Sequence, residues 1–218
     1  QLWMYAFGVF AIFVIGCAYY VWTTQKIALI ADPAPAPKPA RLEEAVVVVE
    51  QLGRGLAPGA FVPTIIASAV IAACGTNEQK ARLLPGLADG SVKAAIAPGG
   101  DVTGAGSFSG NAGTALGAGL ADVLLVASGD DVAVVDAHGS GVTVDIPANL
   151  DPTRRSGRVT LAGAAGETLA GARSTLTDMA RLILAAEATG VARECTLMAA
   201  EYAKARIQFG RPIAMYQA

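Results

Sequence analysis

The hydrophobic pattern changes its period twice along this chain, and this change limits the possible folds more than any other feature. Apolar residues recur at helical spacing from Leu42 to Asp89, and from Val92 to about Leu169 they form short runs that glycines separate. From Leu176 to about Gln208 the helical spacing returns. The order predicts the α+β class, with a helical segment, a small β domain and then long C-terminal helices.

Local start and stop signals divide the helical segment into three helices. A first helix is expected over 42–56, where apolar residues mix with good helix formers before a cluster of glycines. A second, apolar helix is expected over Phe61–Cys74. Thr76 and Gln79 have the spacing of a capping box, which predicts the start of a third helix that ends at 89–90.

Strands are expected wherever short apolar runs lie between glycines, as at Val123–Ala127, Val132–Val135 and Val142–Ile146. After them a long helix is expected to pass through Gly190. The apolar face predicted for this helix consists of Met179, Leu182, Ile183, Ala186, Val191, Leu197, Met198 and Tyr202.

An apolar run without a single charge, Leu2–Trp22, precedes all of these elements. At about 1.5 Å per helical residue it spans roughly 30 Å, which is the thickness of the bilayer core. Aromatic side chains lie at both of its ends, where they anchor helices at membrane interfaces. The run therefore predicts one transmembrane helix over residues 1–25, and the alternative is a helix buried in a protein core.

Prolines alternate with alanines over 32–39, which predicts an extended polyproline spacer within a linker at 26–40. The main domain is then expected to lie in the cytoplasm, tethered to a membrane. It would be purely cytoplasmic if residues 1–40 are not naturally contiguous with the rest. The expected domains are the helical segment 41–91, the β domain 92–172 and the start of a C-terminal helical domain, 173–218.

Charge and cysteine usage exclude several classes of function. The net charge is −2 and no stripe of basic residues is present, so nucleic acid is not expected as a partner. The three cysteines lie far apart and have no CxxC spacing, which argues against a disulfide framework and a zinc site. His138 is the single histidine, so neither a Ser-His-Asp triad nor a histidine-rich metal site is expected, and no metal is predicted.

Three segments carry a resemblance to a known family. They are residues 50–58 (EQLGRGLAP), 75–85 (GTNEQKARLLP) and 201–213 (EYAKARIQFGRPI), with Gln217 behind the third. Their order and spacing resemble the acyl-CoA dehydrogenase family, and the third matches its Tyr-x-x-x-R-x-Q-F-G-x-P-I signature. The resemblance covers about four fifths of the chain.

The resemblance implies a helical domain, a β domain and C-terminal helices, with FAD between the β domain and the helices. It implies the oxidation of an acyl-CoA to a 2-enoyl-CoA, with electrons passing to an electron-transfer flavoprotein, in a homo- or hetero-oligomer. The residues that match the signature and would reach the FAD of a neighbouring protomer are Arg206, Gln208, Phe209 and Gln217. The guanidinium of Arg206 suits a pyrophosphate by charge and geometry.

The chain departs from the family at the flavin cradle and at the catalytic base. The family's Thr-Glu-Pro motif reads Ile96-Ala97-Pro98 here, and no tryptophan follows in the β domain. The glycines from Gly104 to Gly119 lack the context of a dinucleotide fingerprint, so turns are the expected use. A minority of the family carries the base directly before an arginine that corresponds to Arg181, and that position is Ala180. The catalytic base is therefore unknown.

Other charged residues are expected to have no catalytic role. Glu187 and Glu194 are interpreted as polar-face residues of the long helix, and His138 and Arg154 as loop residues. Two functions remain. The first is an acyl-CoA dehydrogenase-type subunit whose partner protomer completes the FAD site. The second is a non-catalytic structural subunit of a membrane-associated complex that keeps the fold.

Overall fold

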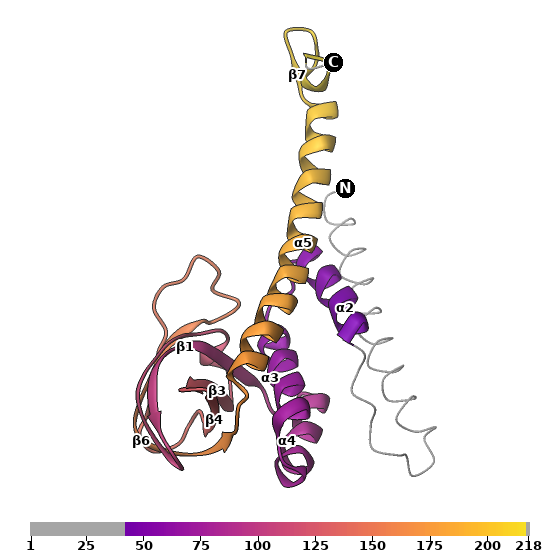
Figure 1. The fold of residues 1–218 in the computed structure, drawn as a ribbon. Coiled ribbons are helices and arrows are strands. Elements are labelled where there is room, and N and C mark those ends of the chain that lie inside the picture. The colour runs from indigo at the N-terminus through magenta and orange to yellow at the C-terminus, as the bar shows by residue number, and fades with distance from the viewer. Residues whose placement is uncertain (1–41, 217–218) are drawn as a thin grey trace. The chain divides into compact units, whose positions relative to one another are not determined.

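The computed structural model describes residues 42–216, which fold into helices, a sheet and a long helix that ends in a hairpin (Figure 1). The helices are α2 (Leu42–Arg54), α3 (Phe61–Cys74), α4 (Asn77–Asp89) and α5 (Arg173–Ala205), with the 3-10 turns η1 (Ala118–Leu120) and η2 (Ile213–Tyr216). The strands are β1 (Ala94–Gly104), β2 (Ser107–Ala115), β3 (Val123–Ser128), β4 (Asp131–Asp136), β5 (Val142–Asp145), β6 (Gly157–Leu169), β7 (Ile207–Gln208) and β8 (Arg211–Pro212).

The predicted membrane helix at 1–25 and the spacer at 26–40 lie outside the described residues. Within 42–216, no helix combines the length and the apolar character that a bilayer crossing needs.

The local signals of the helical segment are confirmed. Helix α3 occupies the predicted residues, and the side chains and backbone of Thr76 and Gln79 form both bonds of the capping box of α4. Gly90 ends α4 in the left-handed conformation, which a glycine adopts without steric cost. These boundaries depend on neighbouring residues alone, which is why the sequence predicts them.

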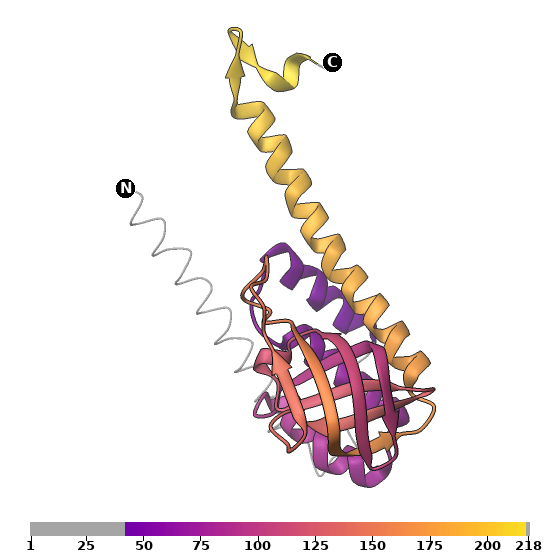
Figure 2. The same ribbon diagram turned by 90° about the vertical axis from the view of Figure 1, so that its left-hand side faces the viewer.

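The β domain is a closed barrel (Figure 2). Its strand order is β2-β1-β3-β4-β6, and β6 pairs back with β2. The short β5 pairs with residues 158–161 of β6. Only β1 and β3 run parallel, and every other pair in this sheet is antiparallel. Closure leaves few unpaired strand edges, which protects the backbone from pairing with other chains.

Two cores follow from the alternation of side chains along the strands. Residues such as Phe108, Leu124 and Val126 face the inside of the barrel. Their neighbours Ile96 and Leu125 point outward and pack with α3, α4 and the first half of α5. Both faces of β3 are therefore buried, which explains its continuous apolar sequence.

Helix α5 continues through Gly190, and α2 crosses it at this residue at close range. A Cβ added to Gly190 would lie 1.9 Å from the backbone oxygen of Glu50, and one added to Gly53 would lie 2.2 Å from the backbone oxygen of Glu187. Glycine is needed at both positions so that the two backbones can approach. Gly190 is thus a contact point between two helices and not a stop signal.

In the first half of α5 the predicted apolar face is correct at Met179, Ile183 and Ala186, which pack in the core. It is wrong at Leu182, which is 40% exposed. The buried residues are Leu176, Ala180, Ile183, Ala186 and Gly190, a stripe that uses small residues where α2 approaches. Beyond Gly190 the side chains of Leu197, Met198 and Tyr202 are 48%, 65% and 59% exposed. The helix also ends at Ala205 and not near Gln208, because the chain turns into the hairpin β7–β8.

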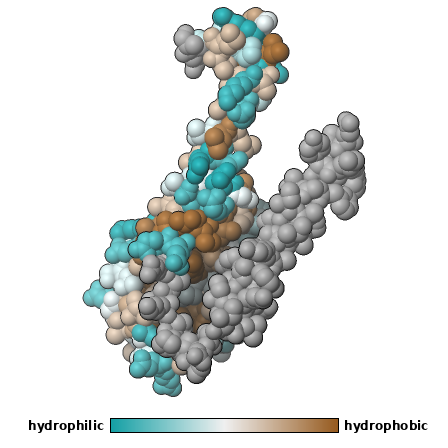
Figure 3. Space-filling view, turned by 90° about the vertical axis from the view of Figure 1, so that its right-hand side faces the viewer, coloured by the Kyte–Doolittle hydropathy of each residue, from teal (hydrophilic) through white to brown (hydrophobic). Residues whose placement is uncertain are grey.

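Apolar side chains also reach the surface on α2. Val47 is exposed, and Val46 and Val48 are half-buried on the same helix. Figure 3 shows an apolar patch on the body of the molecule. The projecting part of α5 above this patch has both polar and apolar surface.

Candidate functional site

The residues predicted to bind a cofactor lie in the hairpin that follows α5. Arg206 ends the helix: its amide donates to the carbonyl of Tyr202 at 2.8 Å, and its own carbonyl accepts from the amide of Ile213 at 2.9 Å. The turn between β7 and β8 consists of Phe209 and Gly210, with φ angles of 51° and 82°. Two consecutive positive φ angles are typical of tight two-residue hairpins, and glycine at the second position makes this one possible.

Tyr216 holds this hairpin in shape. Its hydroxyl donates to the carbonyl of Gln208 at 2.9 Å, and its ring meets Phe209 edge to face at 6.4 Å between centroids. The guanidinium of Arg211 lies 4.1 Å from the centroid of the Tyr216 ring, a cation–π contact. The hairpin is therefore ordered by its own contacts before any ligand or partner binds.

The structure brings Arg206, Gln208 and Phe209 together on one exposed hairpin, while Gln217 lies outside the described residues. The Phe209 side chain is 92% exposed. Among residues 42–216, no carboxylate pairs with the guanidinium of Arg206. A charged donor group that no described neighbour neutralises can bind a phosphate supplied from outside, and the assignment to FAD stays a prediction.

At positions 96 and 97, where the family's flavin motif has polar residues, β1 offers no polar side chain, and its polar residues Asp101 and Thr103 lie further along the strand and are exposed. Ile96 and Ala97 lie in the middle of β1 and are buried. The amide and the carbonyl of Ile96 are both bonded to Leu116, at 3.3 Å and 2.9 Å. Residues 96–97 therefore do not fit a cradle that donates hydrogen bonds to a flavin, whereas the hairpin does fit a phosphate.

The glycine-rich stretch has the structural use that the sequence predicts. Gly104 and Gly106 flank the turn from β1 to β2, and Gly110 and Gly113 lie at the shifts in register between β2 and β6. Glycines here shape turns and bulges of the barrel and not a nucleotide-binding loop.

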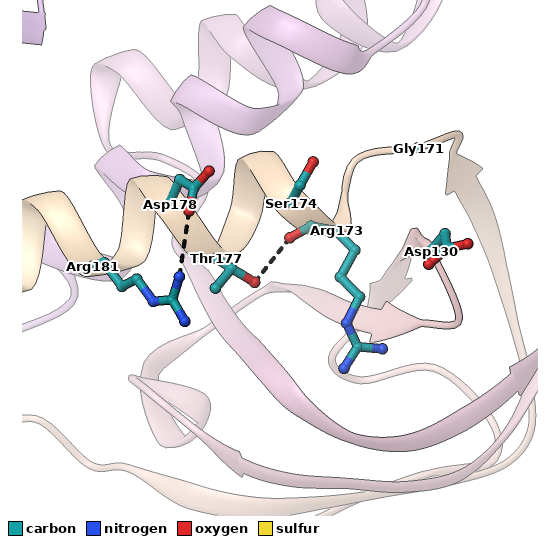
Figure 4. Close-up of a pocket in the computed structure, with 7 residues that line it drawn as sticks. All are labelled: Asp130, Gly171, Arg173, Ser174, Thr177, Asp178 and Arg181. Carbon is teal, nitrogen blue, oxygen red and sulfur yellow. Dashed lines mark hydrogen bonds and ion pairs between the residues drawn. The ribbon is translucent and has the colours of Figure 1, made fainter.

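An open pocket lies where α5 begins, against the turn between β3 and β4 (Figure 4). Its volume is about 420 Å³, and its lining residues are Asp130, Gly171, Arg173, Ser174, Thr177, Asp178 and Arg181. Arg173 donates to the carbonyl of Gly129 at 2.8 Å, and Arg181 lies 3.6 Å from Asp178 at the surface. Figure 4 shows both guanidinium groups beside the same stretch of α5.

The start of α5 adds a donor to this pocket. Ala172 occupies the N-cap position and provides no side-chain cap. Among the described residues, the amide of Ser174, which lines the pocket, has no hydrogen-bond acceptor. Asp130 and Asp178 balance the charge of the two arginines in this lining, so the open amide at the helix start is the feature that favours an anion. In the sequence, this pocket corresponds to a helix start without a Ser, Thr, Asp or Asn cap, followed by arginines. No site was predicted from this pattern.

The two glutamates of α5 are not free, and Arg154 is not a simple loop charge. Arg154 pairs with Glu187, and both side chains are largely buried, with 15% and 17% of their surface exposed. Glu194 accepts two hydrogen bonds from Arg54 of α2, at 3.1 Å and 3.2 Å. Arg154 lies in a loop, as predicted, and its ion pair ties this loop between β5 and β6 to α5. Neither glutamate is an available base.

The remaining candidates agree with their expected positions. Ala180 is buried in the core beside Ile183, so the position that carries a base in some family members has no acid or base here. His138 lies in the turn after β4 and is 75% exposed. The carboxyls of Asp89, Asp122 and Asp151 have lowered pKa values because Ser91, Lys93 and Thr153, respectively, donate hydrogen bonds to them. All three lie outside the hairpin and outside the pocket at the start of α5.

Two family models match this chain. The model of the acyl-CoA dehydrogenase N-terminal domain matches residues 39–91, and the model of the acyl-CoA dehydrogenase C-terminal domain matches residues 170–218. The first match covers the helices α2 to α4 and the second covers α5 and the hairpin.

Curated relatives have the same family name. Acyl-CoA dehydrogenase IpdE2 of Mycobacterium tuberculosis is 33% identical over 81% of this chain and 49% of its own length. Acyl-CoA dehydrogenase FadE34 of the same organism is 31% identical over 81% of this chain and 24% of its own length. The chain spans about half the length of the two IpdE2 relatives that it matches.

Solved structures share the fold. A variant of the Tcur3481-Tcur3483 steroid ACAD superposes with a TM-score of 0.71 at 31% identity, over 81% of this chain and 54% of that one. The ChsE4-ChsE5 complex of Mycobacterium tuberculosis superposes with a TM-score of 0.73 at 25% identity, over 80% of this chain and 53% of that one. Both matches support the predicted α+β fold.

Proposed function

The chain belongs to the acyl-CoA dehydrogenase family, and we propose that it is a subunit of an enzyme that oxidises an acyl-CoA to the 2-enoyl-CoA with FAD. A partner protomer would complete the flavin site. The single observation that carries this proposal is the contrast between two parts of the chain. The signature hairpin presents Arg206 without an ion-pair partner among the described residues, whereas β1 has lost the polar side chains of the flavin motif.

This contrast favours a shared site. A guanidinium can form two parallel hydrogen bonds to a phosphate, so Arg206 can hold the pyrophosphate of an FAD bound mainly by another chain. Two of the structural relatives have names that join two polypeptides, Tcur3481-Tcur3483 and ChsE4-ChsE5. These names support a hetero-oligomer with a second acyl-CoA dehydrogenase-like chain.

The pocket at the start of α5 is the proposed position for the phosphates of the CoA substrate. The amide of Ser174 is open at an uncapped helix start, and Arg173 and Arg181 supply guanidinium donors beside the carboxylates of Asp130 and Asp178. One structural relative is called a steroid enzyme, which favours a bulky acyl group for this chain too. Electrons would then leave through an electron-transfer flavoprotein, as the family resemblance implies.

Purification with the natural partner tests the proposal. The full chain is tagged in its source cells, the assembly is isolated, and its flavin content and its reduction by acyl-CoA substrates are measured. The expected result is an assembly that contains a second acyl-CoA dehydrogenase-like chain and FAD, while the chain alone binds FAD weakly. Stoichiometric FAD binding by the isolated chain would contradict the need for a partner.

The structural alternative has its own supporting observation. Ile96, Ala97 and Ala180 replace polar residues of the family by buried apolar ones, so this chain could keep the fold without chemistry. A colourless assembly whose subunit stoichiometry collapses without this chain would favour a non-catalytic structural subunit.

A further inference from the structure

A second open pocket lies on the β domain, apart from the hairpin and from the start of α5. Its volume is about 520 Å³, and its lining residues are Ala118, Gly119, Leu120, Ala121, Ala137, His138, Val144, Ile146 and Arg155. Seven of these residues are glycine or have apolar side chains. The two polar residues, His138 and Arg155, contribute an imidazole and a guanidinium group. An apolar wall with a few polar groups is the usual composition of a small-molecule site.

Arg155 has an unusual backbone conformation beside this pocket. Its φ angle is 45°, in the left-handed region that is unfavourable for residues other than glycine. Its carbonyl accepts a hydrogen bond from the amide of Gly119 at 2.9 Å, which fixes the loop against η1. The neighbouring Arg154 turns to Glu187 on α5 instead. Two consecutive arginines are thus directed to different places, and the second one lines the pocket.

Gly119 leaves room for the Arg155 side chain. A Cβ at this position would lie 3.0 Å from Nε of Arg155 and 3.0 Å from Cδ1 of Ile146. Among residues 42–216, the Arg155 guanidinium has no carboxylate partner and makes no hydrogen bond. The carboxylate of Asp122 lies 3.8 Å from Nε2 of His138 and pairs with Lys93 at 3.1 Å, and the carboxylate of Asp136 accepts from the His138 amide at 2.8 Å. The charge of Arg155 is therefore available to a ligand.

We propose that this pocket binds a small organic carboxylate with an apolar body. The Arg155 guanidinium matches the two oxygens of a carboxylate, and the aliphatic side chains of Leu120, Val144 and Ile146 can cover a short hydrocarbon. A phosphate dianion fits less well, because Arg155 is the only permanent cation in the lining and no long helix begins there. The site shares no residue with the hairpin or the α5 pocket, so it stands independently of the proposed function.

The single histidine of the chain makes a direct test possible. The full chain is titrated with sodium octanoate while the imidazole resonances are followed by NMR, since every histidine signal must come from His138. A saturable shift is expected. Arg155→Gln should weaken the affinity about tenfold or more, as expected for the loss of a charged hydrogen-bond donor. Arg158→Gln, a matched change at an exposed residue of β6 outside the pocket, should leave the affinity unchanged.

Two comparisons keep the test decisive if Arg155→Gln does not fold. Gly119→Ala keeps Arg155 and His138 but narrows the pocket beside Arg155, so it should also weaken octanoate binding. Octylamine, with the same apolar body and the opposite charge, should produce no saturable shift. The proposal is overturned if octanoate and octylamine bind equally, if wild type shows no saturable shift at millimolar octanoate, or if inorganic phosphate displaces octanoate at equal concentration.

Discussion

At the scale of single residues, the ion pair between Arg154 and Glu187 joins the β domain to the long helix. Both side chains are largely buried, and Asp151 lies 3.8 Å from the same guanidinium. Removing one partner leaves the other charge poorly solvated, so Arg154→Ala should lower the free energy of unfolding by about 1–3 kcal/mol. Urea denaturation measures this change.

A double-mutant cycle separates the pair from its surroundings. Glu187→Ala and the double variant complete the cycle, and a coupling free energy of about 1 kcal/mol or more is expected for residues in direct contact. Strictly additive effects of the two substitutions would show that the pair contributes nothing.

Arg206 is the single residue on which the proposed FAD contact depends most. Arg206→Ala should reduce the FAD occupancy of the purified assembly by more than tenfold, because removing a charged partner from a buried contact costs about 2–5 kcal/mol. Arg158→Ala, at an exposed position of β6, is the matched control. Helix content, measured by circular dichroism, should stay the same in both variants. Full flavin occupancy in Arg206→Ala would refute the role of the hairpin.

Asp122 gives a prediction about pH. Its pKa is lowered, chiefly because the amide of Lys93 donates to its carboxylate at 2.8 Å, with the Lys93 ammonium 3.1 Å away. A folded-state pKa below the unfolded one stabilises the protein above the ordinary carboxyl pKa of about 4, and the stabilisation is lost as the pH falls through the lowered value. Because the Asp122 side chain is 39% exposed and solvent screens its charge, Asp122→Asn should be less stable than wild type near neutral pH by less than about 1 kcal/mol.

The same comparison at acidic pH checks the sign. The difference in free energy of unfolding between wild type and Asp122→Asn should shrink as the carboxyl of Asp122 becomes protonated, below about pH 4. A difference that stays constant from neutral to acidic pH would mean that the charge of Asp122 is not responsible.

At the scale of the elements, the contact between α2 and α5 depends on two glycines. A methyl group on Gly190 would meet the backbone oxygen of Glu50, which cannot move without shifting α2. Gly190→Ala should therefore destabilise the protein by about 1–3 kcal/mol or more, although alanine is the better helix former in isolation. Gly99→Ala is the control, since a Cβ there meets no atom within 4 Å. Equal urea midpoints for the two variants would contradict the close approach.

The same elements show which features a sequence can predict. The limits of α3 and the capping box of α4 depend on residues a few positions apart, and both were predicted. The long strands β1 and β6, with 11 and 13 residues, exceed the predicted short runs because bulges and glycines interrupt their alternation. The closure of β2 onto β6 depends on pairing between distant segments, which no local pattern specifies.

The candidate site also has a part that the sequence can predict and a part that only the fold determines. Arg206, Gln208 and Phe209 belong to one contiguous motif, so the sequence could identify them together. The pocket at the start of α5 combines Asp130 with Arg181, and the Arg154–Glu187 pair joins residues 33 positions apart. Partners of this kind become neighbours only when the barrel docks on the helix, and periodicity does not contain that information.

At the scale of the whole molecule, the apolar run Leu2–Trp22 still predicts a membrane helix, outside the described residues. The full chain should then stay in the pellet when membranes are extracted with alkaline carbonate, and a variant without residues 1–25 should move to the supernatant. Release of the full chain alongside the truncated one, while a known integral protein stays in the pellet, would refute the span.

The crossing of α2 and α5 also has a consequence for how the chain is made. The bonds from Arg54 to Glu194 join residues 140 positions apart, so α2 leaves the ribosome long before its partner exists. At about 5–20 residues per second, this delay is on the order of 10–30 s. During that interval the valines of α2 remain available to chaperones, and the barrel can close before the first helix of the domain has docked.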